Sequence, residues 1–353
     1  MTILNPTTPI PGCGGSGHSH CPPVDFQLGG VTLLPVLTVI LGLLGNIVAL
    51  WIFCFKLKAW NINNLFLFNL IIADFLILMS LPLRIDALRR GHWVFGDGLC
   101  SIDLFLLYSN RSASIALMTV LAIYRYFKVV HPHHWFSRMT KRQAAYMLVV
   151  VWLLIISPRV PILTNKHTEG NGTRTRCLFF TCSSHIALIT MHRILTVLEF
   201  IIPMAMLLFC AIRISSFLRE RQMGKPEKVR KAMRVCTAIV VVFMVCFLPT
   251  TVTTIGVWVI HSYNPEDCDT FNIFVKLTIV ALGLNFLNSA LDPIVYIFSS
   301  SMFKRALCSS LPHFLRCGQD ADDAEMTTSS IESQSNTQKD LKSIRADRGN
   351  EAM

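Results

Sequence analysis

A single arginine interrupts a long apolar stretch of this chain. Arg111 stands within "LFLLYSNRSASIALMTVLAI", residues 104–123, about as long as a helix that crosses the hydrocarbon of a bilayer. A charge at membrane depth costs several kcal/mol, so such residues mark ligand or ion pathways by default. A guanidinium also offers a planar fork of donors that fits a carboxylate. The stretch therefore predicts a membrane helix with an anion-binding side chain, unless Arg111 pairs internally, for instance with Glu199.

A second arginine follows on the same predicted helix. Arg125, in "YRYF", comes fourteen residues after Arg111. At about 1.5 Å per residue the two positions lie about 21 Å apart, and nearly four turns separate them, so they share a helix face. One helix therefore presents a cation toward each side of the membrane.

Other apolar segments also contain isolated polar groups. They are Asn46 in "LLGNIVAL", Asp74 in "NLIIADF", and Asn288, Ser289 and Asp292 in "NSALDPIVY". Polar side chains at membrane depth need partners on neighbouring helices. Two compatible interpretations follow: a structural cluster that joins three helices, and a hydrated switch that accepts a cation, such as sodium, around Asp74.

These side chains must be positioned by membrane-spanning helices. The chain has 353 residues, of which 52% are hydrophobic and 15% charged, whereas soluble domains have about a quarter charged. Seven segments are long and apolar enough to span a bilayer: 31–55, 65–86, 98–124, 143–163, 190–212, 235–260 and 272–298. Pro249 and Pro293 each remove a backbone hydrogen bond from the last two. We therefore expect an all-α membrane protein, a seven-transmembrane helix bundle in which two helices are kinked.

The lysines and arginines of the loops predict the orientation. The first 30 residues contain neither, whereas the links after the first, third and fifth spans are basic. By the positive-inside rule this multi-pass chain then has its N-terminus outside the cell and its C-terminus in the cytoplasm. No signal peptide is recognisable before residue 30, and the first span would act as the insertion signal. The net charge of +11 reflects this topology and does not indicate nucleic-acid binding.

Composition divides the chain into four parts. They are an extracellular N-terminus (1–28), the seven-helix domain (29–299), a short amphipathic helix on the inner leaflet (300–318) and a disordered cytoplasmic tail (319–353).

Three positions are candidates for glycosylation or palmitoylation. Asn171, in "NGT" of the second outer loop, is a glycosylation acceptor, and Cys308 or Cys317 is placed to carry a palmitoyl group. No metal site is expected, because the isolated histidines of "HSH" (18–20) and "HPHH" (131–134) are more often solvated than metal-bound. No nucleophile–base pair indicates an enzyme.

The predicted topology puts six cysteines outside the membrane: Cys13, Cys21, Cys100, Cys177, Cys182 and Cys268. An even number of cysteines in an oxidising compartment predicts disulfides. Six cysteines allow fifteen connectivities, so spacing alone leaves the pairing open.

Several short motifs lie at characteristic places in the spans. They are "GN" (45–46), "AD" (73–74), Arg125, Trp152, Pro203, "CFLP" (246–249) and "LDPIVY" (291–296). Together they resemble the rhodopsin-class G-protein-coupled receptors over about residues 28–310. The segments "SLPLRID", "LYSNRSAS", "RYFKVVHPHH", "LEFIIP", "AMRV" and "NSALDPIVYIFSS" are similar to the hydroxycarboxylic-acid and oxoeicosanoid branch of that class. "SLPLRID" and "NRSAS" lean toward its oxoeicosanoid members.

The resemblance implies a carboxylate ligand. Arg111 matches the arginine that anchors the carboxylate in that branch. Arg84, in "LPLRID", is a second candidate, with snorkelling to the headgroups as the alternative. His192 is a weaker candidate, at a rim expected to be solvated. Phe286 stands where the branch usually has a tyrosine, and the missing hydroxyl favours a longer, more apolar fatty-acid ligand, an oxo-eicosanoid such as 5-oxo-eicosatetraenoate.

The resemblance also implies disulfides. Cys100 would pair with Cys177, while Cys13 and Cys21 would pair with Cys182 and Cys268 in an order left open.

The same resemblance implies a receptor of the plasma membrane with a switch that activates a heterotrimeric inhibitory G protein and lowers cyclic AMP. Its residues are Asp74, Tyr124, Arg125, Tyr126, Phe247, Pro249, Asn288, Asp292, Pro293 and Tyr296. The sixth span would swing about Pro249 and open a cavity where Arg125 meets the G protein. Tyr124 replaces the acidic residue that usually precedes this arginine. With Arg125 unrestrained, we expect raised ligand-free signalling, or else weak coupling.

The tail contains candidate sites for receptor kinases. Hydroxyl residues that follow acidic ones are Thr327, Thr328, Ser329, Ser330, Ser333 and Ser335. Their phosphates would recruit arrestin through charge, whereas the alternative is a tail that serves solubility alone.

Three other functions compete with the acidic-lipid receptor. The first is a receptor for small hydroxycarboxylic acids, such as lactate, hydroxybutyrate or nicotinate-like acids. The second is a non-signalling scavenger receptor, suggested by Tyr124. The third, a transporter, is disfavoured because no internal repeat is evident.

Overall fold

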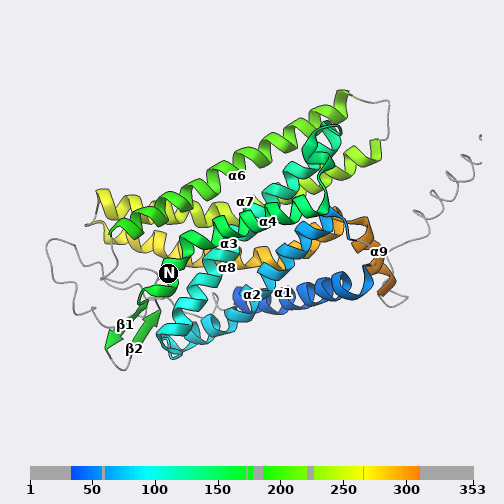
Figure 1. Ribbon diagram of the computed structural model, residues 1–353. Helices are drawn as coiled ribbons and strands as arrows, with labels where there is room; N and C mark the ends of the chain where they lie inside the picture. The colour runs from blue at the N-terminus through cyan, green and yellow to red at the C-terminus, as the bar shows by residue number, and fades with distance from the viewer. Residues whose placement is uncertain are drawn as a thin grey trace, which may run out of the picture. The chain divides into compact units, whose positions relative to one another are not determined.

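Long helices dominate the part of the chain that the structure describes (Figure 1). The computed structural model describes residues 33–57, 60–171, 174–177, 186–220, 226–264 and 266–310. The long helices are α1 (Leu33–Trp51, continued by the π-helix η1, Ile52–Lys56), α2 (Ile62–Arg90), α3 (Gly96–Val130), α4 (Lys141–Ile156), α6 (Ile186–Glu220), α7 (Pro226–Tyr263) and α8 (Cys268–Ser299). Short elements are η2 (Trp135–Arg138), η3 (Ser157–Arg159), α5 (Val160–Thr164), β1 (Thr168–Asn171), β2 (Arg174–Cys177) and α9 (Ser301–Ser310).

The seven expected spans are present, and most helices are longer than the apolar segments that predicted them. Among the described residues, seven helical segments have the length and composition to cross a membrane, and the fourth of them runs from Lys141 through η3 to Thr164. α3 extends over Gly96–Val130, beyond the predicted 98–124. An apolar run marks only the hydrocarbon layer, whereas a helix continues until its backbone groups are capped.

Polar residues set several of the helix ends. The Asn61 side chain accepts a hydrogen bond from the Asn64 backbone N–H (2.8 Å) and caps the start of α2. Gly91 ends α2 with φ 75°, a left-handed conformation that suits glycine. Thr140 and Gln143 form a capping box at the start of α4.

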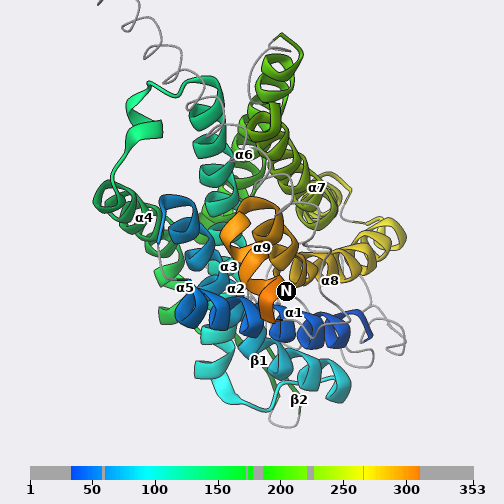
Figure 2. The same cartoon turned by 90° about the vertical axis from the view of Figure 1, so that its right-hand side faces the viewer.

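α3 lies in the middle of the bundle (Figure 2). It contacts α2, α4, α6 and α7, as well as α5 and the strand β1. A polar side chain on α3 can therefore reach partners on most other spans, which explains why the positions of interest converge on it.

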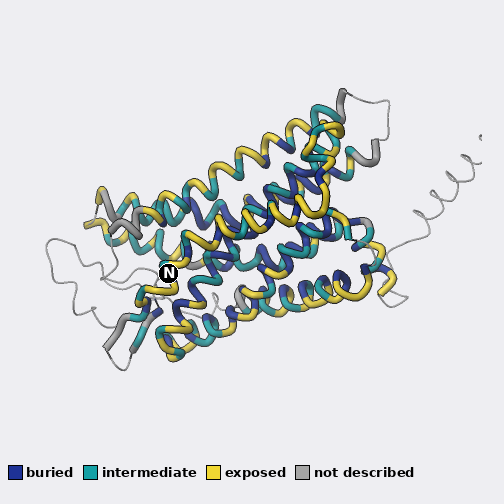
Figure 3. Tube along the Cα trace, viewed as in Figure 1, coloured by how far each residue is buried: buried dark blue, intermediate teal, exposed yellow. Residues whose placement is uncertain are grey.

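The helices have exposed outward faces (Figure 3), and many large apolar side chains lie exposed on them. Leu44 of α1 is 61% exposed, Leu154 of α4 70% and Phe209 of α6 52%. Soluble monomers do not expose apolar surface on this scale, so these faces are the ones that contact lipid.

α1 and α8 approach closely at one glycine. A Cβ atom at Gly45 would lie 2.9 Å from Cγ of Pro293, closer than real Cβ atoms come to a neighbour. The glycine of the "GN" motif is therefore needed for the first span to pack against the proline of the seventh.

A β-hairpin lies in the segment expected to be loop. β1 and β2 are antiparallel, with Thr168 opposite Cys177. The Trp93 backbone N–H donates to the Thr175 carbonyl at 2.7 Å, and the Asp97 carboxylate accepts from the backbone N–H groups of His167 and Thr168. The bundle is all-α, as predicted, whereas the hairpin was not predicted from the sequence. We call this side of the bundle the hairpin end.

The Cys100–Cys177 disulfide implied by the resemblance joins the hairpin to α3. Cys268 is also disulfide-bonded. Cys13, Cys21 and Cys182 lie outside the described residues, so the pairing of Cys268 stays a prediction.

α9 occupies the first part of the segment expected to be an amphipathic helix. Cys308 lies within it and is buried. Cys317 and the six candidate phosphorylation positions lie outside the described residues, as does the segment 1–28. Asn171 is the last residue of β1. These modifications stay predictions.

Candidate functional site

Three buried arginines surround Tyr108. Arg84 comes from α2, Arg111 from α3 and Arg159 from η3, and all three are under 9% exposed. Each is near enough to act electrostatically on Tyr108, and the Arg159 guanidinium lies 5.9 Å from its ring centroid. We call Arg84, Tyr108, Arg111 and Arg159 the arginine cluster.

Two arginines of this cluster each form an ion pair with a carboxylate of their own. Arg84 Nη2 lies 2.5 Å from an oxygen of Asp103, and both side chains are buried. The alternative that Arg84 snorkels to the headgroups is therefore wrong. Arg159 forms an ion pair with Glu199 of α6. Sequence reasoning missed Asp103 and Arg159, although an arginine inside the fourth apolar segment was a visible signal.

Arg111 has a neutral partner instead. Its Nη2 donates to Oγ1 of Thr251 on α7 at 3.0 Å, and its Nε is buried with no hydrogen-bond partner. Among the described residues no carboxylate lies within ion-pair distance of Arg111. The internal pair with Glu199 considered from the sequence is not formed, because Glu199 binds Arg159. Arg111 therefore keeps an uncompensated charge and a free donor.

His192 and Phe286 occupy different surroundings. The His192 ring is buried and meets the Tyr108 ring edge-on at 4.9 Å, so the expectation of a solvated rim is wrong for it. Phe286 of α8 is partly buried against a small cluster formed by Ile77, Leu78 and Leu107. The structure thus brings His192 to the arginine cluster, and it places Phe286 on the apolar surface between α2 and α3.

A second polar group joins four helices around Asp74. Its carboxylate accepts hydrogen bonds from the hydroxyls of Ser289 (2.9 Å) and Tyr296 (3.0 Å) and from the Asn110 amide (3.4 Å). Asn46 donates to the Ser289 carbonyl at 2.7 Å. The structural interpretation of these residues is confirmed, because the contacts tie α1, α2, α3 and α8 together.

Asp292 brings a second carboxylate to the same place. It lies within hydrogen-bond reach of Asp74 and accepts from the Asn288 amide at 3.1 Å. Asp292 Oδ1 and Asn288 Oδ1 are buried without a hydrogen-bond partner. No arginine, lysine or histidine among the described residues forms an ion pair with either carboxylate. This donor set fits a small hard cation, which prefers oxygen ligands.

At the opposite end from the hairpin, Arg125 is restrained after all. Its Nη2 donates to the carbonyl oxygen of Ser299 and, at 3.1 Å, to the Ser299 hydroxyl. That hydroxyl donates to Asn63 Oδ1 at 3.1 Å. The missing acidic neighbour is therefore replaced by the C-terminal end of α8, where the unpaired carbonyls of the last turn favour a cation. We call this side the Arg125 end.

The neighbours of Arg125 pack into the bundle. Tyr124 is buried edge-on against Phe66, and its hydroxyl accepts from Lys128 Nζ at 3.1 Å. The Tyr126 hydroxyl lies 3.0 Å from His131 Nε2. These two tyrosines pack the last turns of α3 against neighbouring side chains.

Phe247 and Pro249 lie within α7, which continues through the proline. Phe247 is buried against Phe243, with ring centroids 5.3 Å apart, and its carbonyl accepts from the Thr251 hydroxyl at 2.9 Å. Thr251 therefore contacts both Arg111 and the turn that contains Pro249.

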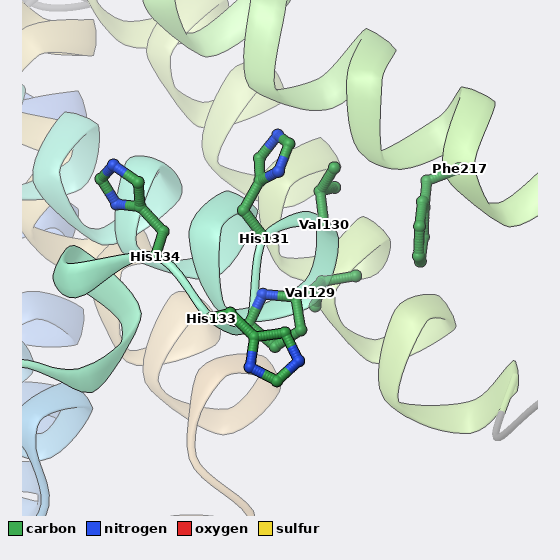
Figure 4. A pocket seen from close by; sticks show the side chains of 7 residues that line it. Val129, Val130, His131, His133, His134 and Phe217 are labelled. Carbon is green, nitrogen blue, oxygen red and sulfur yellow. The ribbon is translucent and has the colours of Figure 1, made fainter.

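A cavity of about 520 Å³ lies beside the Arg125 end (Figure 4). Its lining residues are Val129, Val130, His131, Pro132, His133, His134 and Phe217. The rings of His131, His133 and His134 point in different directions (Figure 4), and His133 Nδ1 lies 2.6 Å from Arg138 Nη2. Within the described part of the chain no three or more His, Cys, Asp or Glu side chains gather in a group that could hold a metal ion.

The class of protein is defined by seven helices of membrane-spanning length among the described residues, a buried polar group around Asp74 and an arginine near the C-terminal end of α3. Residues 45–296 match the family described as 7 transmembrane receptor (rhodopsin family), and the chain belongs to that family. Within it, the chain belongs to the hydroxycarboxylic acid and oxoeicosanoid branch of G-protein-coupled receptors.

Three relatives support this assignment. Hydroxycarboxylic acid receptor 2 from Homo sapiens is 40% identical over 266 residues, which cover 75% of this chain and 72% of that receptor. Hydroxycarboxylic acid receptor 1 from Mus musculus is 39% identical over 79% of this chain and 81% of that receptor. Oxoeicosanoid receptor 1 from Homo sapiens is 36% identical over 82% of this chain and 75% of that receptor.

Proposed function

We propose that this receptor binds a carboxylate ligand, an acidic lipid of the oxo-eicosanoid type, with Arg111 as the anchor. The observation that carries the proposal is the contrast within the arginine cluster. Arg84 and Arg159 each form an ion pair with a carboxylate of the protein, whereas among the described residues the hydrogen-bond partner of Arg111 is the Thr251 hydroxyl. A buried guanidinium without a counter-ion is costly, and a ligand carboxylate would compensate it.

The apolar cluster beside Tyr108 supports a ligand with an apolar tail, because Tyr108 packs against the same residues as Phe286. Phe286 packs on Ile77, Leu78 and Leu107 without a hydroxyl to contribute. A small hydroxy acid needs several polar contacts to reach useful affinity, whereas a long chain gains from apolar burial.

A receptor for small hydroxycarboxylic acids is the second candidate. It is favoured by the relatives, since five hydroxycarboxylic acid receptors are 38–40% identical to this chain and the human oxoeicosanoid receptor is 36% identical. The polar surface of Tyr108, His192 and the three arginines would suit such a ligand. An acidic lipid has a long apolar tail to bury, whereas a small hydroxycarboxylic acid has none. The dependence of receptor potency on the chain length of the ligand therefore distinguishes the two candidate functions.

Signalling follows from the Arg125 end in this proposal. The basic links support a receptor in the plasma membrane whose Arg125 end faces the cytoplasm. Ligand binding would favour an arrangement in which Arg125 leaves Ser299 and α7 swings about Pro249. The exposed arginine would then activate an inhibitory G protein and lower cyclic AMP. Receptor kinases and arrestin would act on the C-terminal tail.

A sodium ion is proposed at the Asp74 group. Asp74 would hold it, together with the unpaired Asp292 Oδ1 and Asn288 Oδ1. The cation would compensate two neighbouring carboxylates and hold α2 and α8 together in the resting receptor.

The test measures inhibition of stimulated cyclic AMP in cells that express the receptor, against fatty acids of increasing chain length, 5-oxo-eicosatetraenoate, lactate and hydroxybutyrate. Arg111→Gln should lower the potency of the active carboxylate by at least about thirtyfold, because a buried charge pair is lost. Arg111→Lys, which keeps the charge without the fork, should lose less. Arg213→Gln, at an exposed position of α6, is the control for expression.

Three results would overturn parts of the proposal. Full potency in Arg111→Gln would exclude Arg111 as the anchor. A response to lactate with none to long chains would establish the second candidate. Internalisation of ligand without any G-protein response would establish a scavenger.

A further inference from the structure

The ion pair between Arg159 and Glu199 lies directly beside the proposed anchor. Ser112, the residue after Arg111, accepts from Arg159 Nη2 at 2.9 Å and donates to Glu199 Oε1 at 2.9 Å. Arg159 also lies over the Tyr108 ring, one turn before Ser112 on α3. The charges of Arg159 and Glu199 both act on Arg111. The pair therefore forms one wall of the same site.

The balance of charge at this site is set by Glu199. Arg111 and Arg159 contribute two positive charges, and Glu199 removes one of them. Glu199 is also the more accessible partner, since its side chain is 22% exposed and that of Arg159 is 3% exposed. A ligand that reaches Arg111 thus meets one uncompensated cation and, next to it, a carboxylate that repels a second anionic group.

We propose that Glu199 is a specificity-determining residue, which restricts the receptor to ligands with a single carboxylate by occupying Arg159. Arg159 is in this view a second carboxylate-binding side chain that the protein itself has filled. The inference rests on the proposed function, because it assumes that Arg111 binds a carboxylate. Glu199 does not bind the ligand carboxylate, as Arg111 does. It repels a second anionic group of the ligand by its own charge and keeps Arg159 from binding that group.

The substitution Glu199→Gln separates charge from shape. Glutamine keeps an oxygen that can accept from Arg159 and Ser112, but it releases the positive charge of Arg159. A dicarboxylate could then place one group on Arg111 and the other on Arg159. The variant should therefore bind dicarboxylates more tightly than the wild type does, because Arg159 can form charge-assisted hydrogen bonds with the second carboxylate.

The experiment uses the full-length receptor in cell membranes and measures nucleotide exchange on a G protein. The probes are matched pairs of unbranched saturated acids, a monocarboxylate and the α,ω-dicarboxylate of the same length, from two to sixteen carbons. In the wild type the monocarboxylate should be the stronger ligand of each active pair. In Glu199→Gln the ratio of dicarboxylate to monocarboxylate potency should rise by about tenfold or more.

Two further variants keep the test decisive if Glu199→Gln folds poorly. Glu199→Asp keeps the negative charge and should keep the wild-type ratio. The double variant Arg159→Gln, Glu199→Gln has neither charge of the pair, so it leaves no unpaired buried ion and should also return to the wild-type ratio. A double variant that still prefers dicarboxylates would overturn the role of Arg159.

The outcomes distinguish this inference from the proposed function. If Arg111→Gln abolishes the monocarboxylate response but Glu199→Gln leaves the ratio unchanged, the anchor stands and Glu199 has no part in selectivity. If the wild type responds to no carboxylate, the proposed function fails and the selectivity proposal fails with it.

Discussion

The guanidinium of Arg125 on α3 donates to both the carbonyl and the hydroxyl oxygen of Ser299 at the end of α8. The usual restraint for this arginine is a carboxylate next to it in sequence, and Tyr124 occupies that position here. In this protein Arg125 is held by a residue of another helix and not by its neighbour in sequence. Release of Arg125 must therefore separate α3 from α8.

Ser299→Ala should raise ligand-free signalling. The substitution removes one acceptor of Arg125 and the donor to Asn63, while the carbonyl remains. A loss of about 1 kcal/mol from the resting arrangement corresponds to about a fivefold rise in basal nucleotide exchange. Ser300→Ala, which removes a hydrogen bond to Asn64 at the same end, is the matched control and should change basal exchange less. Equal effects of both variants would show that Arg125 is not the group concerned.

Tyr124→Asp should lower ligand-free signalling. A carboxylate beside Arg125 would add an ion pair to the contacts with Ser299 and favour the resting state. Tyr124→Phe removes only the hydroxyl that accepts from Lys128, so its basal cyclic AMP should resemble the wild type. Unchanged ligand-free signalling in Tyr124→Asp, at equal surface expression, would contradict the idea that the missing acid raises basal activity.

Asp74→Asn should remove the effect of sodium on ligand binding. The wild type should bind its agonist more weakly as sodium replaces potassium, because the cation holds the resting arrangement of α2 and α8. The asparagine keeps a side chain that can bond Ser289 and Tyr296 but lacks the charge that attracts a cation. Agonist affinity of the variant should be independent of sodium in a filter-binding titration. A sodium dependence equal to that of the wild type would exclude Asp74 as the site.

Gly45→Ala should destabilise the bundle. The added methyl would lie 2.9 Å from the Pro293 ring, which cannot move away as a flexible side chain would. Overpacking of this kind costs about 1–3 kcal/mol. The measurement is the temperature at which detergent-solubilised receptor loses ligand binding. Gly98→Ala, at a position where a Cβ meets no atom within 4 Å, is the control and should keep the wild-type value.

Local features of the sequence were enough for the spans and for the polar group around Asp74. Span length depends on runs of apolar residues along the chain, and the seven runs correspond to seven helices. Asn46, Asp74 and Ser289 had to find partners on other helices because water is absent at that depth, and they found one another. The hairpin was missed because its backbone partners, Trp93 and Asp97, lie far from it in sequence.

The sequence by itself determined that this chain has seven spans, an arginine at membrane depth on the third and a receptor's motifs. Only the tertiary structure decided which arginine is compensated. From the residue types alone, Glu199 could form an ion pair with either Arg111 or Arg159. The packing of α4 and α6 against α3 places it beside Arg159, and the two form an ion pair. Arg125 likewise had no visible partner until α8 brought Ser299 to it. Charge pairing at membrane depth depends on the rotation and depth of each helix, which are set by side-chain packing between helices and not by the periodicity of any one of them.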